Sequence, residues 1–195
     1  MKTITFKNSV TSILRQTILF ITSTLLLLSC SNDDNANPIP VEEEETITTI
    51  TITLVQEGVG EPTILQSKDL DGDGPNAPEI SISGNLATNA SYNGTIVLLN
   101  ETESPAKNVT EEVKEEDDEH QFFFNATGSL IGTSYADTDE NGNPIGLAFI
   151  LNTGDAGNAT LTVTLRHQPK KPNDGTLADA GGETDIAQTF NVKVE

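Results

Sequence analysis

The sequence has no tryptophan, a single cysteine and few basic residues, and each scarcity excludes a class of protein. One cysteine cannot build a disulfide framework or a cysteine-based zinc cluster. The 10 Lys and Arg residues stand against 30 Asp and Glu, which gives a net charge of −20. Binding to nucleic acid requires clustered basic side chains that contact phosphates, so we expect no nucleic-acid partner. Aromatic residues make up 5% of the chain, so the aromatic platforms usual in sugar binding are also scarce.

No motif in the chain marks a catalytic centre. Serine, histidine and aspartate all occur, but there is no G-x-S-x-G turn or comparable setting for a nucleophile. A pair of carboxylates can act on a glycosidic bond, yet such a pair carries little information among 30 acidic residues. We therefore expect a protein that is not an enzyme.

The first 29 residues have the layout of a bacterial lipoprotein signal peptide. Three basic residues precede an apolar run at 17–28, which is too short to span a bilayer. The run ends at Leu27-Leu28-Ser29-Cys30, which resembles a lipobox. In such lipoproteins the peptide is cut just before the cysteine, whose sulfur is then lipidated. We expect residues 1–29 to be removed and Cys30 to carry acyl chains such as palmitate, which anchor the protein to a membrane.

The stretch that follows the predicted signal peptide indicates where in the cell the protein is located. Residues 30–45 are polar, acidic and contain proline, which is typical of a disordered spacer. The pair Asp33-Asp34 close behind Cys30 resembles the surface-export signal of Bacteroidetes lipoproteins. We therefore expect an outer-membrane lipoprotein that faces either the periplasm or the cell surface. Its acidity repels anionic headgroups, so the lipid anchor must hold it to the membrane.

From residue 46 onward the pattern is typical of β-strands. Residues 46–55 largely alternate apolar side chains with threonine, as half-buried strands do. Further short apolar segments, separated by turn residues, lie at 64–65, 80–82, 95–100, 120–124, 146–151, 159–167 and 186–194. We predict that residues 46–195 form an all-β domain, an antiparallel, Ig-like β-sandwich of about eight short strands. Residues 108–119 predict either a short helix, capped by Asn108, or an acidic loop.

Two acidic loops have the spacing of calcium ligands. Carboxylates at alternate positions of a tight loop can converge on one ion, although both loops lack the final glutamate of an EF-hand. The alternative is a pair of turns in which the carboxylates accept hydrogen bonds from backbone amides. The candidate calcium ligands are Asp69, Asp71 and Asp73 in the first loop and Asp137, Asp139 and Asn141 in the second.

The two histidines form a second candidate site. Counting by two along each strand places His120 on the face of Phe122 and His167 on the apolar face of its own strand. Glu116 and Asp118 would share the face of His120 if that segment is extended. Two imidazoles with carboxylates nearby bind zinc or another divalent metal. The spacing does not show that the histidines meet, so the alternative is two separate rim histidines bonded to backbone.

Five stretches together carry a family resemblance: DLDGDGPNAP at 69–78, EHQFFF at 119–124, ENGNPIG at 140–146, LTVTLRH at 161–167 and GGETDI at 181–186. With them the chain resembles a family of Bacteroidetes (flavobacterial) lipoproteins. Members often carry the label "type 1 periplasmic binding fold superfamily protein", which denotes two α/β lobes, whereas the threonine-rich alternation here predicts strands. The resemblance brings no catalytic or binding residues, and it suggests that some members accompany TonB-dependent outer-membrane receptors.

Taken together, these features predict a membrane-anchored, non-catalytic binding or interaction module whose binding depends on a cation. A second hypothesis is a protein that captures a divalent metal or small ligand and works with a TonB-dependent outer-membrane receptor. A third is a structural or adhesive surface module with no ligand.

Overall fold

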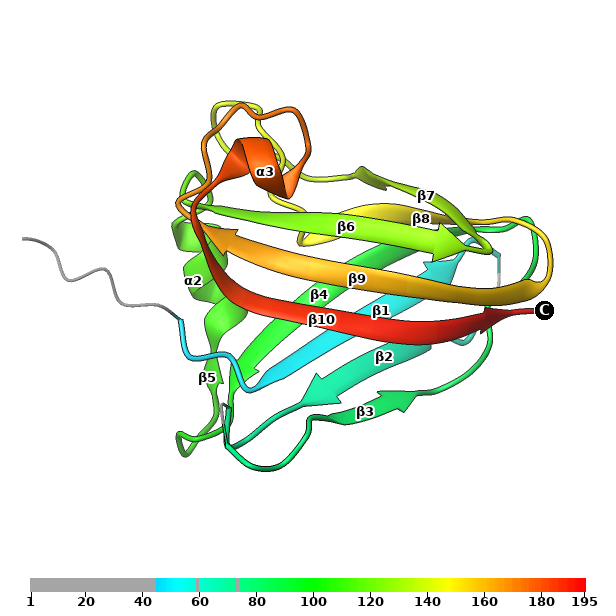
Figure 1. Cartoon of the computed structure of the whole chain (residues 1–195), viewed down its shortest axis with the longest axis horizontal. Coiled ribbons are helices and arrows are strands. Elements are labelled where there is room, and N and C mark those ends of the chain that lie inside the picture. Colours follow the sequence, from blue (N-terminus) through cyan, green and yellow to red (C-terminus); the bar gives the residue numbers. More distant parts are fainter. Residues whose placement is uncertain (1–44, 59, 73) are drawn as a thin grey trace, which may run out of the picture. The chain divides into compact units, whose positions relative to one another are not determined.

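The computed structural model describes residues 45–58, 60–72 and 74–195, all of which belong to one compact unit, Glu43–Glu195. The predicted signal peptide, the predicted lipidation site Cys30, nearly all of the predicted spacer and Asp73 lie outside the described residues. The described residues confirm the prediction of an all-β sandwich with two antiparallel sheets (Figure 1). Within these ranges, no helix has the length and apolar character needed to cross a membrane.

The larger sheet contains seven strands, and β1 (Thr49–Gln56), the strand that comes first in the sequence, is the threonine-rich segment. Along that strand Ile50, Ile52 and Leu54 are fully buried on one face, while threonines occupy the positions between them. The strand order is β3-β2-β1-β4-β8-β7, and β5 pairs with β4. The strands are β1 (Thr49–Gln56), β2 (Thr63–Lys68), β3 (Glu79–Ile82), β4 (Ser91–Asn100), β5 (Lys107–Asn108), β7 (Leu130–Tyr135) and β8 (Ala148–Thr153).

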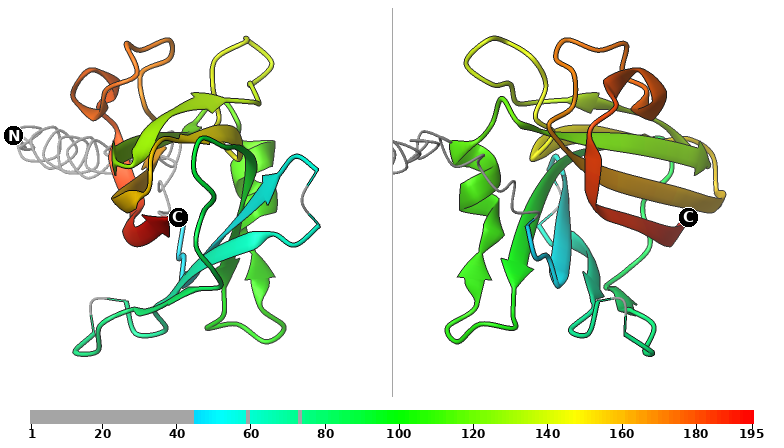
Figure 2. Two further views of the ribbon diagram at one scale, coloured as in Figure 1. Left: turned by 90° about the vertical axis from the view of Figure 1, so that its right-hand side faces the viewer. Right: turned by 60° about the vertical axis from the view of Figure 1, so that its left-hand side comes forward.

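The smaller sheet has three long strands, with β9 (Gly157–His167) between β10 (Glu183–Val194) and β6 (His120–Gly128). Figure 2 shows the two sheets as separate layers. The core lies between their inner faces, and its largest fully buried side chains are Phe122, Phe149 and Phe190. Burying each such side chain contributes about 1.5–3 kcal/mol, so most of the stability comes from this layer.

The acidic segment that connects β5 of the larger sheet to β6 of the smaller sheet contains a short helix, α2 (Val109–Glu115). Asn108 caps it by accepting a hydrogen bond from the backbone N–H of Thr110, and Val113 packs in the core. After the helix, residues 116–119 form a turn rather than an extended strand. The expected extension that would bring Glu116 and Asp118 onto the face of His120 is therefore wrong.

The structure has two strands, β5 and β7, that the sequence pattern did not predict, and a second short helix, α3 (Leu177–Ala180). The residues of β7 read LIGTSY, in which glycine and serine interrupt the apolar alternation, and its register against β8 shifts between Leu130 and Gly132. The other eight strands lie where the sequence placed apolar segments.

Candidate metal centre

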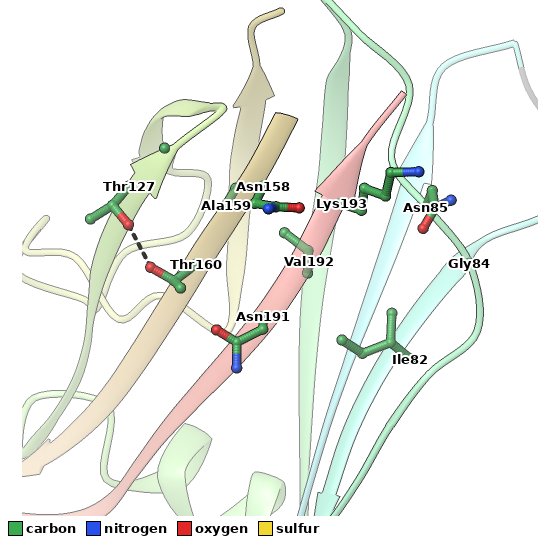
Figure 3. A pocket seen from close by; sticks show the side chains of 11 residues that line it. Ile82, Gly84, Asn85, Thr127, Asn158, Ala159, Thr160, Asn191, Val192 and Lys193 are labelled. Carbon is green, nitrogen blue, oxygen red and sulfur yellow. Dashed lines mark hydrogen bonds between the residues drawn. The ribbon is translucent and has the colours of Figure 1, made fainter. Parts of the chain in front are cut away.

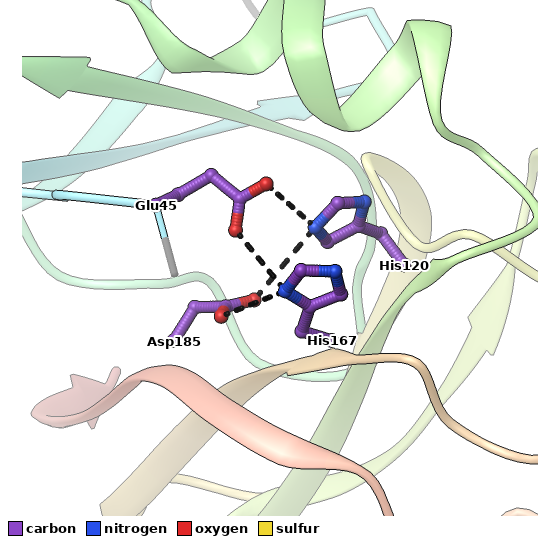
Figure 4. Close-up of side chains that lie close together, drawn as sticks. All are labelled: Glu45, His120, His167 and Asp185. Atoms are coloured by element: carbon purple, nitrogen blue, oxygen red, sulfur yellow. Dashed lines mark ion pairs between the residues drawn. The ribbon is translucent and has the colours of Figure 1, made fainter. Parts of the chain in front are cut away.

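Two histidines and two carboxylates meet at one end of the smaller sheet (Figure 4). One potential ligand atom from each of Glu45, His120, His167 and Asp185 lies within 4.8 Å of the others. The side chains of His120 and Asp185 are fully buried, and those of Glu45 and His167 are 7% and 10% exposed. The cluster is therefore a compact set of two nitrogen and two oxygen donors that is largely shielded from solvent.

The register of β6 against β9 brings the two histidines together. His120 and His167 are direct partners in the antiparallel ladder, and their rings stack with centroids 4.8 Å apart. His120 begins β6 and His167 ends β9, so each lies at one end of its strand's inward face, next to the buried pair Phe122 and Leu165. The inward direction agrees with the periodicity of the sequence. Their meeting depends on the register, and it replaces the alternative of two separate rim histidines.

A β-bulge turns Asp185 into the cluster. Along β10 the even-numbered residues face the core, as the buried Phe190 and Val192 show, so residue 185 of an unbroken strand would face outward. The pairing with β9 instead shifts between Thr184 and Ile186, which leaves Asp185 as the extra residue of a bulge. Bulges redirect side chains in this way. Asp185 consequently joins the histidines of the two neighbouring strands.

Glu45 reaches the cluster from the segment that precedes β1. Ile47 packs against the core, and the backbone N–H of Thr48 donates to the carbonyl of Leu99 over 2.9 Å. These contacts hold the chain against the larger sheet just before β1 begins. Glu45 is therefore the one member of the cluster that does not come from the smaller sheet.

Contacts on both sides of its ring define the chemistry of His120. Its Nδ1 lies 3.1 Å from the carbonyl oxygen of Glu116. A carbonyl only accepts, so Nδ1 carries a proton and donates it. On the other side, Nε2 lies 3.0 Å from Glu45 Oε1 and 3.9 Å from Asp185 Oδ2. Among the described residues, neither His120 Nε2 nor Glu45 Oε2 has a hydrogen bond of good geometry, although both atoms are buried.

His167 is placed in a similar way. Its Nδ1 lies 3.7 Å from Glu45 Oε2 and 3.9 Å from Asp185 Oδ1. Its Nε2 lies 3.7 Å from Glu119 Oε2, and the same oxygen accepts a hydrogen bond from Gln168. Both rings therefore aim one nitrogen at the two central carboxylates and the other at an oxygen behind the ring. Metal-binding histidines have this arrangement, because the outer contact fixes the tautomer.

The pKa shifts show that the centre of the cluster favours a positive charge. Burial alone would raise the pKa of the Glu45 carboxyl, but the contact with His120 outweighs burial and the pKa lies below its ordinary value. Burial alone would lower the pKa of His120, but the Glu45 carboxylate outweighs it, helped by the Glu116 carbonyl and Asp185, and the pKa is raised. The carboxylates therefore stabilise a cation between them, whether a proton or a metal ion.

The spacing of the donors is close to, and somewhat wider than, that around a tetrahedral ion. Zinc bonds of about 2.0–2.2 Å place neighbouring ligand atoms roughly 3.3–3.6 Å apart in a tetrahedron. The contacts from the two histidine nitrogens to the carboxylates run from 3.0 to 3.9 Å, and each carboxylate turns one oxygen toward His120 and the other toward His167. With one ligand atom from each residue, the four donors lie within 4.8 Å of one another, so a bound tetrahedral ion would draw the most distant donors closer by about 1 Å. Imidazole nitrogen suits zinc and similar transition metals, whereas calcium takes oxygen ligands.

The first predicted calcium loop is described only in part, because Asp73 lies outside the described residues. Asp71 is exposed and accepts a 2.7 Å hydrogen bond from the Asn76 side chain, which lowers the pKa of its carboxyl. Asp69 donates its backbone N–H to Thr48, and its Oδ1 is buried without a hydrogen bond among the described residues. Calcium binding in this loop remains a prediction.

The second predicted calcium loop has the geometry of the alternative turn structure. The two carboxylate oxygens of Asp137 accept hydrogen bonds from the backbone N–H groups of Gly146 and Ala148, at 2.7 and 2.8 Å. Asp139 Oδ1 likewise accepts from the N–H of Asn141 at 2.9 Å, and Lys171 lies 3.3 Å from Asp139 Oδ2. Asn141 contributes its backbone here. The carboxylates thus organise the connection from β7 to β8.

A separate pocket of about 590 Å³ lies at the other end of the smaller sheet (Figure 3). Its lining is rich in threonine, asparagine and glycine, and Thr127 and Thr160 are hydrogen-bonded to each other there. Lys193 is the one charged residue of the lining. The pocket therefore offers hydroxyl and amide groups, and it shares no residue with the cluster of histidines and carboxylates.

Sequence reasoning missed two of the four residues of the cluster. Glu45 was assigned to the spacer, and Asp185 precedes the apolar segment that was predicted as the last strand. The sequence signal near Asp185 is the pair Gly181-Gly182, and both glycines have positive φ angles in the structure. A Cβ on Gly182 would lie 2.3 Å from the carbonyl oxygen of His167. The paired glycines therefore mark the place where the start of β10 approaches the end of β9 closely.

Comparisons with protein-family models, with curated proteins and with solved structures find no match to this chain. What the fold and the cluster define is an all-β sandwich with a buried set of two histidines and two carboxylates. Its function is therefore inferred from the chemistry of that cluster.

Proposed function

We propose that this protein is a membrane-anchored, non-catalytic module of the bacterial cell envelope that binds one divalent transition-metal ion of the zinc class. The ligands are His120, His167, Glu45 and Asp185. The convergence of these four donors in a buried space supports the proposal most strongly.

Charge balance supports a divalent ion. Two ionised carboxylates and two neutral imidazoles leave two negative charges in a buried space, which is unfavourable. One proton on His120 removes half of that charge. A divalent ion removes all of it, and it also provides a partner for the buried His120 Nε2 and Glu45 Oε2. Metal binding therefore neutralises more of the charge of the cluster, and pairs more of its polar atoms, than protonation does.

The coordination supports a non-catalytic role. Catalytic zinc sites have three protein ligands and keep a fourth position for water or substrate, whereas structural sites use four protein ligands. Here four side chains converge, and none is more than 10% exposed. An ion held by all four has no open tetrahedral position for a substrate.

The location of the module is proposed from residues outside the described ranges. The signal-peptide pattern and the lipobox support a lipid anchor on Cys30, and the acidic pair behind it supports the outer membrane. The membrane is then a partner through the anchor alone.

A second candidate function is capture of a divalent metal for an outer-membrane receptor. It is favoured by the position of Glu45, which lies on a segment outside the strands and can move without breaking a ladder. A structural ion would be retained for the life of the fold, whereas a captured ion must exchange. The rate of zinc release to a chelator therefore separates these two functions.

Metal analysis tests the proposal directly. The chain expressed from Ser31 contains the whole described unit, and it is purified without chelator and analysed by mass spectrometry of the elements. We expect about one zinc-class ion per chain, and calorimetric titration of the stripped protein should favour zinc over calcium and magnesium. Asp185→Asn and His167→Asn should weaken this binding strongly, and the exposed Asp155→Asn should keep it. Zinc binding no stronger than calcium binding, or equal binding by all variants, would overturn the proposal and favour a module without a metal.

A further inference from the structure

We propose that the ion is a clasp between the N-terminal segment, residues 45–47, and the smaller sheet, so that metal occupancy and docking of this segment control each other. This inference rests on the proposed metal site. It goes beyond that site by assigning a regulatory role to one ligand, Glu45.

The origin of the ligands supports the clasp. His120, His167 and Asp185 come from β6, β9 and β10, which are the three adjacent strands of the smaller sheet. The ladder pairs His120 with His167, and the pairs formed by Thr184 and Ile186 on either side of the bulge hold Asp185, so the strands position these three residues whether or not an ion is bound. Glu45 comes instead from the chain that enters β1 of the larger sheet. An ion bound to all four would therefore join the two layers at the end where the N-terminal segment enters the sandwich (Figure 4).

The N-terminal segment is held by side chains rather than by strand pairing. Regular pairing of β1 starts at Thr49, and Thr48 makes the first backbone bonds to the larger sheet. Before that point, Ile47 packs against the core and Glu45 contacts the histidines, while Thr46 is exposed. The segment can thus leave the cluster while the strand ladders remain intact.

Thermodynamic linkage makes the coupling reciprocal. Glu45 can bind the ion only when the segment is docked, so the affinity that Glu45 adds equals the stabilisation that the ion gives to docking. Such couplings are typically about 1–3 kcal/mol, which corresponds to a change in affinity of about 5- to 150-fold. Anything that pulls the segment away would weaken ion binding by that factor.

Because Glu45 lies at the start of the domain, this coupling would act on the connection between the domain and its proposed anchor. Glu45 ends the predicted spacer, which starts at Cys30, the proposed site of the lipid anchor. An occupied site would fix the direction in which the chain leaves the sandwich toward its anchor. Loss of the ion would release that direction, and tension on the spacer would promote release of the ion.

Hydrogen exchange measured by mass spectrometry tests the clasp. In the chain from Ser31, zinc should slow exchange of the Thr46 and Ile47 amides more than exchange of the amides in the β1–β2 turn, which serve as the internal reference. In Glu45→Gln, zinc should still bind through three ligands, with affinity lower by about 5- to 150-fold. It should no longer protect Thr46 and Ile47, and a chelator should remove it faster. The exposed Glu57→Gln is the matched control and should behave as the unmodified chain.

The outcomes separate the two proposals. If zinc binds with equal affinity to Glu45→Gln and to the unmodified chain, and exchange at Thr46 and Ile47 does not respond, the clasp is wrong and the metal site stands on three residues. If zinc does not bind the unmodified chain, both proposals are wrong. A cooperative melting transition of Glu45→Gln shows that the variant is folded.

Discussion

His120 and His167 stand directly opposite each other on β6 and β9, with ring planes inclined at 25° and each ring aiming one nitrogen at both Glu45 and Asp185. Two protonated imidazoles at this separation repel each other, so charging both rings is unfavourable. A single proton on one ring neutralises only one of the two negative charges of the carboxylates. A divalent ion compensates both carboxylates and leaves both rings neutral, which is why this pairing favours a metal.

Zinc should stabilise the folded protein. A ligand present at 100 times its dissociation constant adds about 2.7 kcal/mol to the free energy of unfolding, which corresponds to a rise in melting temperature of about 5–10 °C for a domain of this size. Differential scanning calorimetry should show this rise for the unmodified chain and for Asp155→Asn. An equal rise in Asp185→Asn would contradict the assignment of the ligands.

The metal-free protein should lose stability above neutral pH. The raised pKa of His120 contributes stability that is fully present below its ordinary value of 6.5 and is lost as pH rises through the raised value. The lowered pKa of Glu45 contributes stability that is present above its ordinary value of 4.5 and is lost as pH falls through the lowered value. Both contributions are therefore complete between pH 4.5 and 6.5.

Urea unfolding in the presence of a chelator measures this dependence. The free energy of unfolding should be larger at about pH 6 than at about pH 9, because protonated His120 is then paired with Glu45. The other titratable groups at the cluster are Asp185, His167 and Glu119. In Glu45→Gln the difference between the two pH values should shrink. A difference that is the same in both proteins would show that other groups cause it.

Asp137→Asn should destabilise the fold without changing the response to calcium. An amide retains one acceptor oxygen, so the backbone N–H of either Gly146 or Ala148 loses its partner. An unsatisfied buried N–H costs about 1–3 kcal/mol, which urea unfolding can resolve. Asp155→Asn is the matched control. An unchanged stability combined with a reduced calcium response would instead support the calcium hypothesis for this loop.

Calcium at the first loop has its own test. The buried Oδ1 of Asp69 lacks a hydrogen bond among the described residues, and a cation would provide it with a partner. Millimolar calcium should then raise the melting temperature relative to sodium chloride of equal ionic strength, and Asp69→Asn should remove the rise. No rise in the unmodified chain would exclude calcium binding there.

Gly182→Ala should disturb the proposed metal site, although Gly182 is not one of its ligands. The new Cβ would lie 2.3 Å from the carbonyl oxygen of His167, at a backbone position with φ of +70°. We expect a loss of more than about 1 kcal/mol in the free energy of unfolding, together with weaker zinc binding, because the start of β10 carries Asp185. Gly60→Ala meets open space and is the control. Zinc affinity equal to that of the control would show that the approach of β10 to β9 does not position the ligand.

The fold was largely predictable from the sequence because alternation is a local property. Ile50, Ile52 and Leu54 recur every second residue, and one buried face follows from that pattern alone. The strand β7 was not predicted, because Gly132 and Ser134 interrupt its apolar pattern. Local periodicity therefore located strands where one face is uniformly apolar and failed where it is not.

The candidate site was half predictable for a related reason. His120 and His167 lie at the ends of apolar stripes, so their inward direction follows from strand geometry. Their contact depends on which residues pair across the ladder, and periodicity does not encode pairing. Asp185 depends on a bulge, and Glu45 on the path of the chain before its first strand. Neither the bulge nor the path of the chain produces a periodic pattern in the sequence.

Because Asp185 is the extra residue of a bulge, it could be removed from the cluster without changing the pairing of the strands. Deleting this one residue would give β10 an unbroken alternation from Thr184 outward to Ile186 inward, while the pairs formed by the rest of β9 and β10 would stay in register. The sandwich would persist without its fourth donor. One inserted residue thus separates a sandwich with three clustered donors from one with four, and the chain length between Gly182 and Phe190 becomes a diagnostic that can be applied to other sequences of this fold.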